Sequence, residues 1–459
     1  MRQIWVAVFA IIAAACGTSG TSGESELTTL TVTLSASSVQ VGHTVTATAV
    51  GLDADGAPVT LAALAWSTSR ADRATVDANG TVTAVAAGEV EIQASSGGVT
   101  ATAALTVAAD PVAACKLPGV QLGVGLGFPR IANRLRSTGD VRIKVLFVDF
   151  SDAVATTTPE ATLAIISPGA EQFYEAVSYG RMHMIFDPVY TWLRMSKPTS
   201  GYPWSPLTFN GQKAFIEEAI QLAGPSVDLS TSDSVVVLSN PDATAFAYGP
   251  AFTANAGDGF LVAGKRFDNA ATSGRDLAGW GPGWLNHELG HTMALADLYE
   301  IGVANPQTFH FTGDFSMMGN ILGAAPEYLG WERWLLGWVD DDKVLCAARG
   351  HSTATLTPVE APGGTKLVVV PTGATTAVVI ESRHALGYDH TLPNEGLLVY
   401  FVDTSIATGQ GIVKVLPIDN ADLHKLSAPL AVTQSLTYAD VTVTFTSQDT
   451  AGDHVDVSY

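Results

Sequence analysis

Two histidines four residues apart, His287 and His291, constrain the fold of this chain more than any other feature. Residues four apart lie one above the other on an α-helix, so both imidazoles can bind one metal ion if this stretch is helical. Glu288 lies beside them, where a carboxylate can take a proton from a metal-activated water. The pattern H-E-x-x-H therefore predicts one catalytic Zn²⁺ and the hydrolysis of peptide bonds.

A catalytic zinc ion needs a third protein ligand and one open position for water or substrate. Asp297 is the leading candidate, because a helix that stops near residues 294–296 can turn the segment after His291 back beneath the metal. Glu327 and His310 are the alternatives further along the chain. Each is weaker, because an isolated Glu or His is more often a surface residue than a ligand.

Two later segments strengthen this interpretation, Phe315-Ser316-Met317-Met318-Gly319 and a stretch that ends in Leu336-Gly337-Trp338. With the run from 287 to 299, they resemble the immune inhibitor A-like family of secreted bacterial metallopeptidases. That family shows H-E-x-x-H-x-x-G-x-x-D-x-Y, a Met-containing turn and a Leu-Gly-Trp segment. The resemblance implies a zincin-type α/β domain with these site residues: His287, His291 and Asp297 as zinc ligands, Glu288 as base, and Met318 as the hydrophobic floor under the zinc.

The match has one departure, because Ala294 stands where the family usually has Gly. Glycine permits a left-handed exit from a helix that alanine resists, so this departure affects the turn towards Asp297 and not the two histidine ligands. Tyr299 and Tyr328 are candidates for a hydrogen bond to the oxyanion that forms during hydrolysis. Either tyrosine can equally be structural.

The composition sets limits on the class of protein. A chain of 459 residues is long enough for about three domains. Its formal net charge of -21 argues against a nucleic-acid partner, because phosphate binding needs clustered Lys and Arg, and the 23 basic residues are spread along the chain. An acidic chain rich in Ala, Thr, Val and Gly is typical of a soluble extracellular protein.

The three cysteines carry information through their positions. Residues 1–16 have the layout of a signal peptide, and the small residues before Cys16 resemble a lipoprotein cleavage box. A lipid on Cys16 would then anchor the chain to the outer surface of the membrane. Residues 17–26 are expected to form a flexible tether. Cys115 and Cys346 remain, an even number that predicts a disulfide bracketing the catalytic segment.

Three regions are expected after the tether. Residues 27–108 alternate apolar and polar residues with regular turn signals, which predicts a β-sandwich, and their Ala74-Thr75-Val76-Asp77 and Asn79-Gly80-Thr81 segments resemble the bacterial Ig-like group 2 domain. Residues 109–349 are expected to form the metallopeptidase domain, because strands and helices alternate before the motif. Residues 350–459 return to alternation of period two, so a β-rich C-terminal domain is expected, where Ca²⁺ is a candidate second metal among the acids after residue 381.

Several elements of the middle region are predicted individually. Strands are expected at 141–150, 189–193 and 234–238, and helices at 168–179, with Phe173, Ala176 and Val177 as its buried stripe, at 211–222 and at 326–338. An edge strand is expected within 242–286, lining the substrate cleft.

Two functions are therefore expected. The first is a secreted or surface-anchored zinc endopeptidase that acts on extracellular proteins. The alternative is a surface adhesion or matrix-binding lipoprotein whose peptidase-like fold no longer cuts.

Overall fold

The computed structural model describes residues 26–459 except 120–122, 203, 205–206, 226, 305, 307 and 419–420. The predicted signal peptide, Cys16 and nearly all of the predicted tether lie outside the described residues. The chain divides into two compact units, Met1–Pro111 and Val112–Tyr459. Both are rich in strands, and the helices are few and short. Among the described residues, no helix combines the length and the apolar character needed to cross a membrane.

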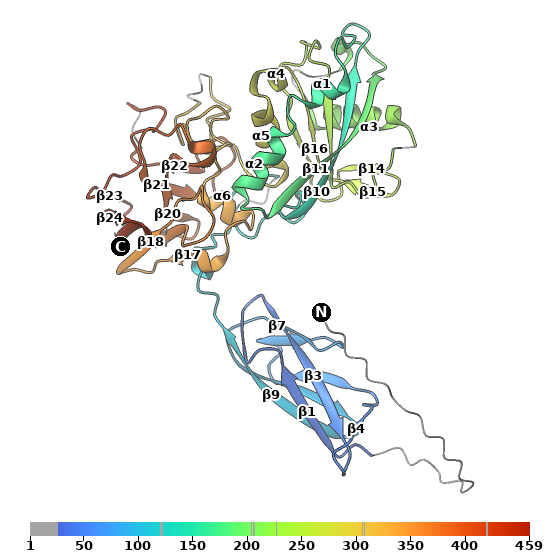
Figure 1. The fold of residues 1–459 in the computed structure, drawn as a ribbon, viewed down its shortest axis with the longest axis vertical. Helices are drawn as coiled ribbons and strands as arrows, with labels where there is room; N and C mark the ends of the chain where they lie inside the picture. The colour runs from blue at the N-terminus through green and yellow to red at the C-terminus, as the bar shows by residue number, and fades with distance from the viewer. Residues whose placement is uncertain are drawn as a thin grey trace, which may run out of the picture. The chain divides into compact units, whose positions relative to one another are not determined.

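The first unit is a β-sandwich (Figure 1). One sheet has the strand order β1-β3-β7-β6, with β4 beside β3, and the other has the order β2-β9-β8-β5. Alternate residues face the core, which explains why the two-residue periodicity identified these strands. The strands are β1 (Thr29–Leu34), β2 (Ser38–Gln40), β3 (Thr44–Leu52), β4 (Pro58–Val59), β5 (Ala65–Thr68), β6 (Ala74–Val76), β7 (Thr81–Ala84), β8 (Gly88–Ser96) and β9 (Val99–Ala108).

The second unit begins with a five-stranded sheet of order β11-β10-β12-β16-β13. The strands are β10 (Gly139–Asp149), β11 (Met182–Arg194), β12 (Ser234–Ser239), β13 (Ala251–Thr253) and β16 (Asn269–Thr272). All neighbours are parallel except β13, which pairs antiparallel with β16 and forms an edge. A separate hairpin, β14 (Phe260–Val262) and β15 (Lys265–Phe267), lies in the same stretch. The predicted edge strand within 242–286 is thus present.

Helices pack on both faces of this sheet (Figure 1). They are α1 (Pro159–Leu163), α2 (Gly169–Val177), α3 (Phe209–Ala223), α4 (Asp276–Trp280) and α5 (Pro282–Thr292). The core on one face joins α2 and α5 to β10, and the core on the other face contains α3. Helix α2 buries Phe173 and Val177 as predicted, but Ala176 is exposed and Tyr174 is buried in its place.

The C-terminal part contains two more sheets. The five-stranded sheet has the order β17-β19-β20-β21-β22, and the four-stranded sheet has the order β18-β25-β24-β23. Their strands are β17 (Val344–Cys346), β18 (His351–Leu356), β19 (Leu367–Pro371), β20 (Thr376–Arg383), β21 (Gly396–Asp403), β22 (Val413–Val415), β23 (Ser435–Tyr438), β24 (Val441–Asp449) and β25 (Gly452–Ser458). The second unit is not divided further by its contacts, so the predicted boundary at residue 350 stays a prediction.

One apolar core connects these layers. It contains Leu289 of α5, Trp331 of α6 (Gly330–Leu335) and Tyr400 of β21. The helix predicted at 326–338 is shorter than expected, because Leu329 has an extended backbone and Glu327 is held by Asp389 and by Arg333. Consequently α5 shares its apolar core with both the α/β layer and the C-terminal sheet.

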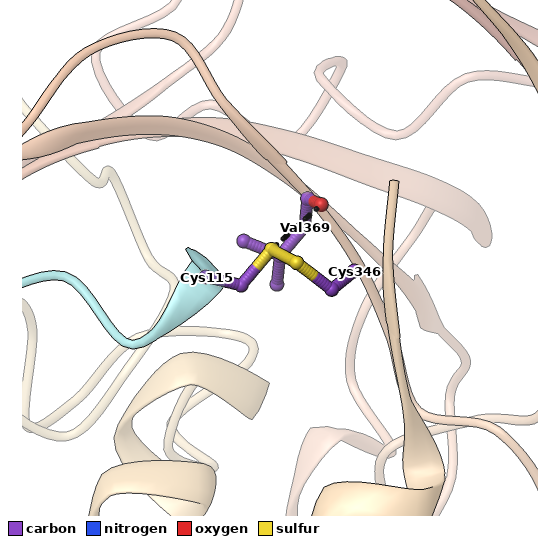
Figure 2. Close-up of a disulfide and its surroundings, with 3 residues drawn as sticks. All are labelled: Cys115, Cys346 and Val369. Carbon is purple, nitrogen blue, oxygen red and sulfur yellow. Dashed lines mark hydrogen bonds between the residues drawn. A yellow bond between two sulfur atoms is a disulfide. The ribbon is translucent and has the colours of Figure 1, made fainter. Parts of the chain in front are cut away.

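A disulfide joins Cys115 to Cys346, as predicted (Figure 2). Their Cα atoms are 5.8 Å apart across a sequence separation of 231 residues. Cys115 ends the short 3₁₀ helix η1 (Ala113–Cys115), and Cys346 ends β17. The Cys115 sulfur lies 3.3 Å from the carbonyl oxygen of Val369. The bridge ties the start of the second unit to its C-terminal sheet.

A buried network of charges lies between α6 and the C-terminal sheet. Arg383 is fully buried and contacts the carboxylates of Glu381 and Asp389, and a second buried pair joins Arg333 to Glu327. Asp389 and Glu381 are therefore held by arginine rather than grouped around an open site. Calcium binding among the acids after residue 381 stays a prediction.

Candidate metal centre

Helix α5 brings the two predicted histidine ligands onto one face. The Nε2 atoms of His287 and His291 lie 3.3 and 3.2 Å from the same oxygen, Oδ1 of Asp297. Among the described residues, these three side chains form the only group of candidate ligands whose atoms all lie within 4.8 Å of one another. A tetrahedral zinc ion with bonds of about 2.0–2.1 Å separates its ligand atoms by about 3.3–3.4 Å. The two distances from the imidazoles to Asp297 are close to this value.

Hydrogen bonds on the far side of each ring orient the ligands. Nδ1 of His287 lies 2.9 Å from the carbonyl oxygen of Met317, and Nδ1 of His291 lies 2.8 Å from that of Leu295. A carbonyl oxygen only accepts, so each Nδ1 must carry the proton and donate it. In a neutral ring, Nε2 therefore presents a lone pair to Asp297.

With neutral rings, the centre consequently brings together three hydrogen-bond acceptors, the two Nε2 atoms and Oδ1 of Asp297, and no donor between them. Oδ1 of Asp297 is buried and has no hydrogen-bond partner among the described residues. Burial alone would lower the pKa of His291, but the charge of Asp297 raises it to about 9. Burial would raise the pKa of Asp297, but the two imidazoles hold it well below its usual range. A cation, either a proton or a metal ion, satisfies all three groups, so the donor set fits a divalent zinc ion.

The end of α5 directs the chain towards Asp297, the candidate third ligand. The amide of Leu295 donates to the carbonyl of Gly290 at 2.9 Å, and the amide of Ala294 donates to the carbonyl of His291 at 2.9 Å. This pair of bonds is a Schellman motif, which requires a left-handed residue after the helix. Ala294 occupies that position with φ of 97°, although it lacks the freedom of glycine. The predicted turn therefore forms despite the alanine.

A distant segment holds Asp297, the candidate third ligand, in place. Thr408 donates its hydroxyl to Oδ2 of Asp297 at 3.1 Å, and the amide of Asp297 donates to the same hydroxyl oxygen at 2.8 Å. The amide of Gly409 donates to the Asp297 carbonyl at 3.0 Å. Thr408 lies 111 residues after Asp297, so no local pattern could have predicted this contact.

The Met-containing turn lies directly against α5. Met318 is fully buried, and its sulfur approaches Gly290 so closely that an added Cβ would lie 2.4 Å from it. The Met318 carbonyl accepts the amide of Leu298 at 2.9 Å, which ties the turn to the ligand segment. Met317 supplies the carbonyl that orients His287. The turn thus supports two ligands through its backbone.

Glu288 projects from α5 into the same cavity as the three ligands. Its Oε2 accepts the amide of Ala251, on edge strand β13, at 2.6 Å. Burial raises the pKa of Glu288, and the nearby imidazoles partly oppose that rise. A buried carboxylate with a raised pKa is suited to exchange protons with water near neutral pH.

The two tyrosine candidates have different surroundings. Tyr299 lines the cavity, and its ring lies 5.9 Å from that of His287. Burial and the charge of Asp297 raise the pKa of Tyr299, so its hydroxyl stays protonated and can donate. Tyr328 is fully buried and donates to the carbonyl of Asn286 at 2.7 Å, which indicates a structural role.

The alternative third ligands lie elsewhere. Glu327 places one carboxylate oxygen 2.5 Å from Arg333 and accepts the amide of Tyr388 with the other at 2.7 Å. His310 packs on Phe311, and neither Glu327 nor His310 belongs to the ligand group found among the described residues. The structure brings together the four residues predicted first, at 287, 288, 291 and 297.

The ligands and Glu288 lie in a cavity of about 810 Å³. Edge strand β13 borders it through Ala251 and Thr253. The carbonyl of Pro250 accepts the amide of Thr272, and the amide of Ala254 donates to the carbonyl of Asp268, so these backbone groups face the interior of the sheet. Along an edge strand, the backbone N–H and C=O groups of successive residues point alternately into and away from the sheet. Those of Ala251 and Thr253 therefore point away from it. The amide of Ala251 indeed meets Glu288.

Comparisons with known proteins concern part of the chain. The bacterial Ig-like domain (group 2) family matches residues 26–107. A comparison with curated proteins found no match. Among solved structures, an intimin mutant of EHEC O157:H7 is 25% identical over 18% of this chain and 50% of its own, with a TM-score of 0.14.

Two other solved structures are also similar. The Escherichia coli adhesin FdeC is 24% identical over 20% of this chain and 37% of its own, with a TM-score of 0.15. The S-layer protein rSbsC is 18% identical over 25% of this chain and 17% of its own, with a TM-score of 0.16. The chain thus spans about half or less of each of these three relatives. TM-scores this low support no functional statement. The family match shows that residues 26–107 form a bacterial Ig-like domain of group 2.

Proposed function

We propose that the chain is a zinc-dependent endopeptidase of the bacterial cell surface or extracellular space. The observation that carries the proposal is the approach of His287, His291 and Asp297 to one point, with Glu288 in the same cavity. The resemblance of the segments at 287–299, 315–319 and 336–338 to immune inhibitor A-like metallopeptidases supports it. The disulfide and the Ig-like domain support an extracellular location.

The chemistry follows from the positions of the side chains. When bound, Zn²⁺ supplies a Lewis acid that polarises the scissile carbonyl and makes water more acidic. Glu288 takes the proton of the attacking water and later returns it to the leaving amine. Tyr299 donates a hydrogen bond to the oxygen that becomes negatively charged. The amide of Ala251 is bonded to Glu288, so the carbonyl of Ala251 and the outward backbone groups of Thr253 hold an extended peptide as an additional strand.

The test combines metal analysis with a cleavage assay on the full secreted chain. The purified protein should contain one zinc per chain, lose cleavage of denatured casein with a chelator, and recover it when zinc is restored. Glu288→Gln should retain zinc but lose about 10²–10⁴-fold in rate, because only the proton acceptor is removed. His291→Ala should lose the zinc.

The alternative, a surface adhesion or matrix-binding lipoprotein without catalysis, makes the opposite prediction. The Ig-like domain suits either function, because such a domain can serve as a spacer or a binding module. Zinc-loaded protein that cuts no protein substrate but binds extracellular matrix equally well as wild type and as Glu288→Gln would favour adhesion. Cleavage that persists in Glu288→Gln would contradict the assignment of the base.

A further inference from the structure

The walls of the cavity around the candidate metal centre are largely apolar. Large side chains line it from segments that are far apart in the sequence: Val124, Tyr248, Trp280, Phe309, Ile321 and Leu322. Three of them are unusually accessible for hydrophobic residues, with exposed fractions of 70% for Leu322, 45% for Tyr248 and 40% for Trp280. Exposed apolar side chains that gather at one opening typically mark a binding surface.

One wall lies directly beside the ligand helix. Ile321 packs so closely on α5 that a Cβ at Gly283 would lie 2.7 Å from its Cγ2 atom. Gly283 precedes His287 by four residues, so both lie on one face of the helix, one turn apart. The glycine therefore leaves room for an apolar wall next to the metal ligands.

Two polar side chains of these walls, Asp276 and Asn320, are already hydrogen-bonded within the protein. The carboxylate of Asp276 accepts three backbone amides, those of Gly249, Gly274 and Leu277, at 2.7, 3.1 and 3.0 Å. The side chain of Asn320 donates to Asp314 at 2.7 Å and accepts the amide of Leu322 at 3.1 Å. These groups have little capacity left to bind a polar side chain of a ligand.

Apart from the two candidate ligands, one histidine is the only basic side chain among the described residues that line the cavity. Neither Lys nor Arg appears among the described residues that line the cavity. His424 lines it, with its Nδ1 2.7 Å from Oδ1 of Asp314 and its ring stacked on Phe309 at 4.9 Å. The charge of Asp314 offsets that of a protonated His424, so the pair offers little attraction to an acidic side chain.

We infer that this cavity selects peptide segments with a large aliphatic or aromatic side chain next to the scissile bond and discriminates against Asp and Glu there. The inference rests on the proposed function and adds a substrate class to it. The apolar walls gain contact area from such a side chain, whereas an acidic side chain loses its hydration without gaining a cation.

The test uses the full zinc-loaded chain and a library of quenched fluorescent decapeptides that differ at the residues flanking the cut, with cleavage sites mapped by mass spectrometry. Peptides with Phe, Leu or Met next to the cut should have a kcat/KM about 10–200-fold higher than the same peptides with Asp or Glu at that position. Leu322→Lys should reduce this ratio by at least about tenfold, because it adds a cation to the exposed edge of the wall. Leu261→Lys is the matched control, since Leu261 is 58% exposed but does not line the cavity, and it should leave the ratio unchanged.

The outcomes separate the two proposals. If no peptide is cut although zinc is bound, the proposed function fails. If peptides are cut without an apolar preference, the inference alone fails. A preference for acidic residues that disappears in His424→Gln would also overturn it, because His424 would then be the dominant recognition group. An equal loss of the ratio in Leu261→Lys and Leu322→Lys would likewise contradict the assignment of the wall.

Discussion

The Ig-like domain and the second unit differ in what they bury. Among the described residues, the buried polar or charged side chains of the first unit comprise Ser96 alone, whereas the second unit buries many. These include the metal-centre residues, the fully buried Arg333 and Arg383, and several carboxylates. Burying charge costs free energy unless every group is paired, and the sandwich of the first unit avoids this cost. The comparison indicates that the second unit gives up stability to position polar groups.

The largest expected effect comes from breaking the buried charge network with Arg383→Met. Removing one partner leaves Glu381 and Asp389 buried without a cation, which should cost about 3–5 kcal/mol in the free energy of unfolding. Denaturant unfolding with hydrogen exchange read separately for each unit measures it. Arg70→Met, which breaks an exposed pair with Asp72 in the Ig-like domain, is the control and should leave both units unchanged. Similar losses in the two variants would remove the contrast between the units.

The second effect is a dependence of stability on pH between about 4.5 and 7, which is expected from Glu332 in the second unit. Burial raises the pKa of Glu332 to about 7, and hydrogen bonds from Ser316 and Leu329 only partly oppose the rise. The folded state therefore holds the proton more tightly than the unfolded state. The stabilisation that protonated Glu332 contributes is complete below about pH 4.5 and is lost as pH rises to about 7. It amounts to a total on the order of 3 kcal/mol.

Glu332→Gln isolates this contribution, because glutamine stays neutral at every pH. The difference in unfolding free energy between wild type and variant should shift in favour of the variant between pH 4.5 and 8. Hydrogen exchange across this range should follow the same course. A constant difference between the two proteins would show that Glu332 does not titrate in this window.

A smaller effect is expected at the contact that holds Asp297. Thr408→Val keeps the shape of the side chain but removes the hydroxyl that bonds both Oδ2 and the amide of Asp297. Residues that orient a metal ligand typically change affinity by about 10–100-fold, so zinc affinity should fall by that factor. Competition with a chromophoric chelator measures it. Thr83→Val, an exposed threonine of β7 in the Ig-like domain, should leave zinc affinity unaltered.

The smallest effect is a gain in stability from Ala294→Gly. A left-handed conformation costs a non-glycine residue about 1–2 kcal/mol, and glycine recovers part of this after its own loss of entropy. Unfolding free energy should rise by about 0.5–1 kcal/mol with unchanged zinc stoichiometry. A loss of stability would mean that the side chain of Ala294, which is buried, contributes more by packing than its backbone strain costs.

The sequence alone was sufficient for features set by local periodicity. The strands of residues 27–108, the helices α2 and α3, and the helical histidine pair follow from spacing, because these spacings place apolar or ligating side chains on one face. The cysteine count predicted the disulfide, because only two thiols remain after Cys16. Asp297 was predicted as the third ligand because its segment directly follows the helix, and the structure places it beside both histidines.

Only the tertiary structure decided how these parts are held. The hydroxyl of Thr408, the carbonyls of Met317 and Leu295, and the amide of Ala251 reach the centre from separate segments, and backbone groups leave no mark in a sequence. The helix expected at 326–338 shortened to Gly330–Leu335 because Glu327 is drawn into a network with Arg333 and Asp389. Local spacing acts over a few residues, whereas buried charges must find partners wherever the fold brings them, so pairing across the chain overrides local preference.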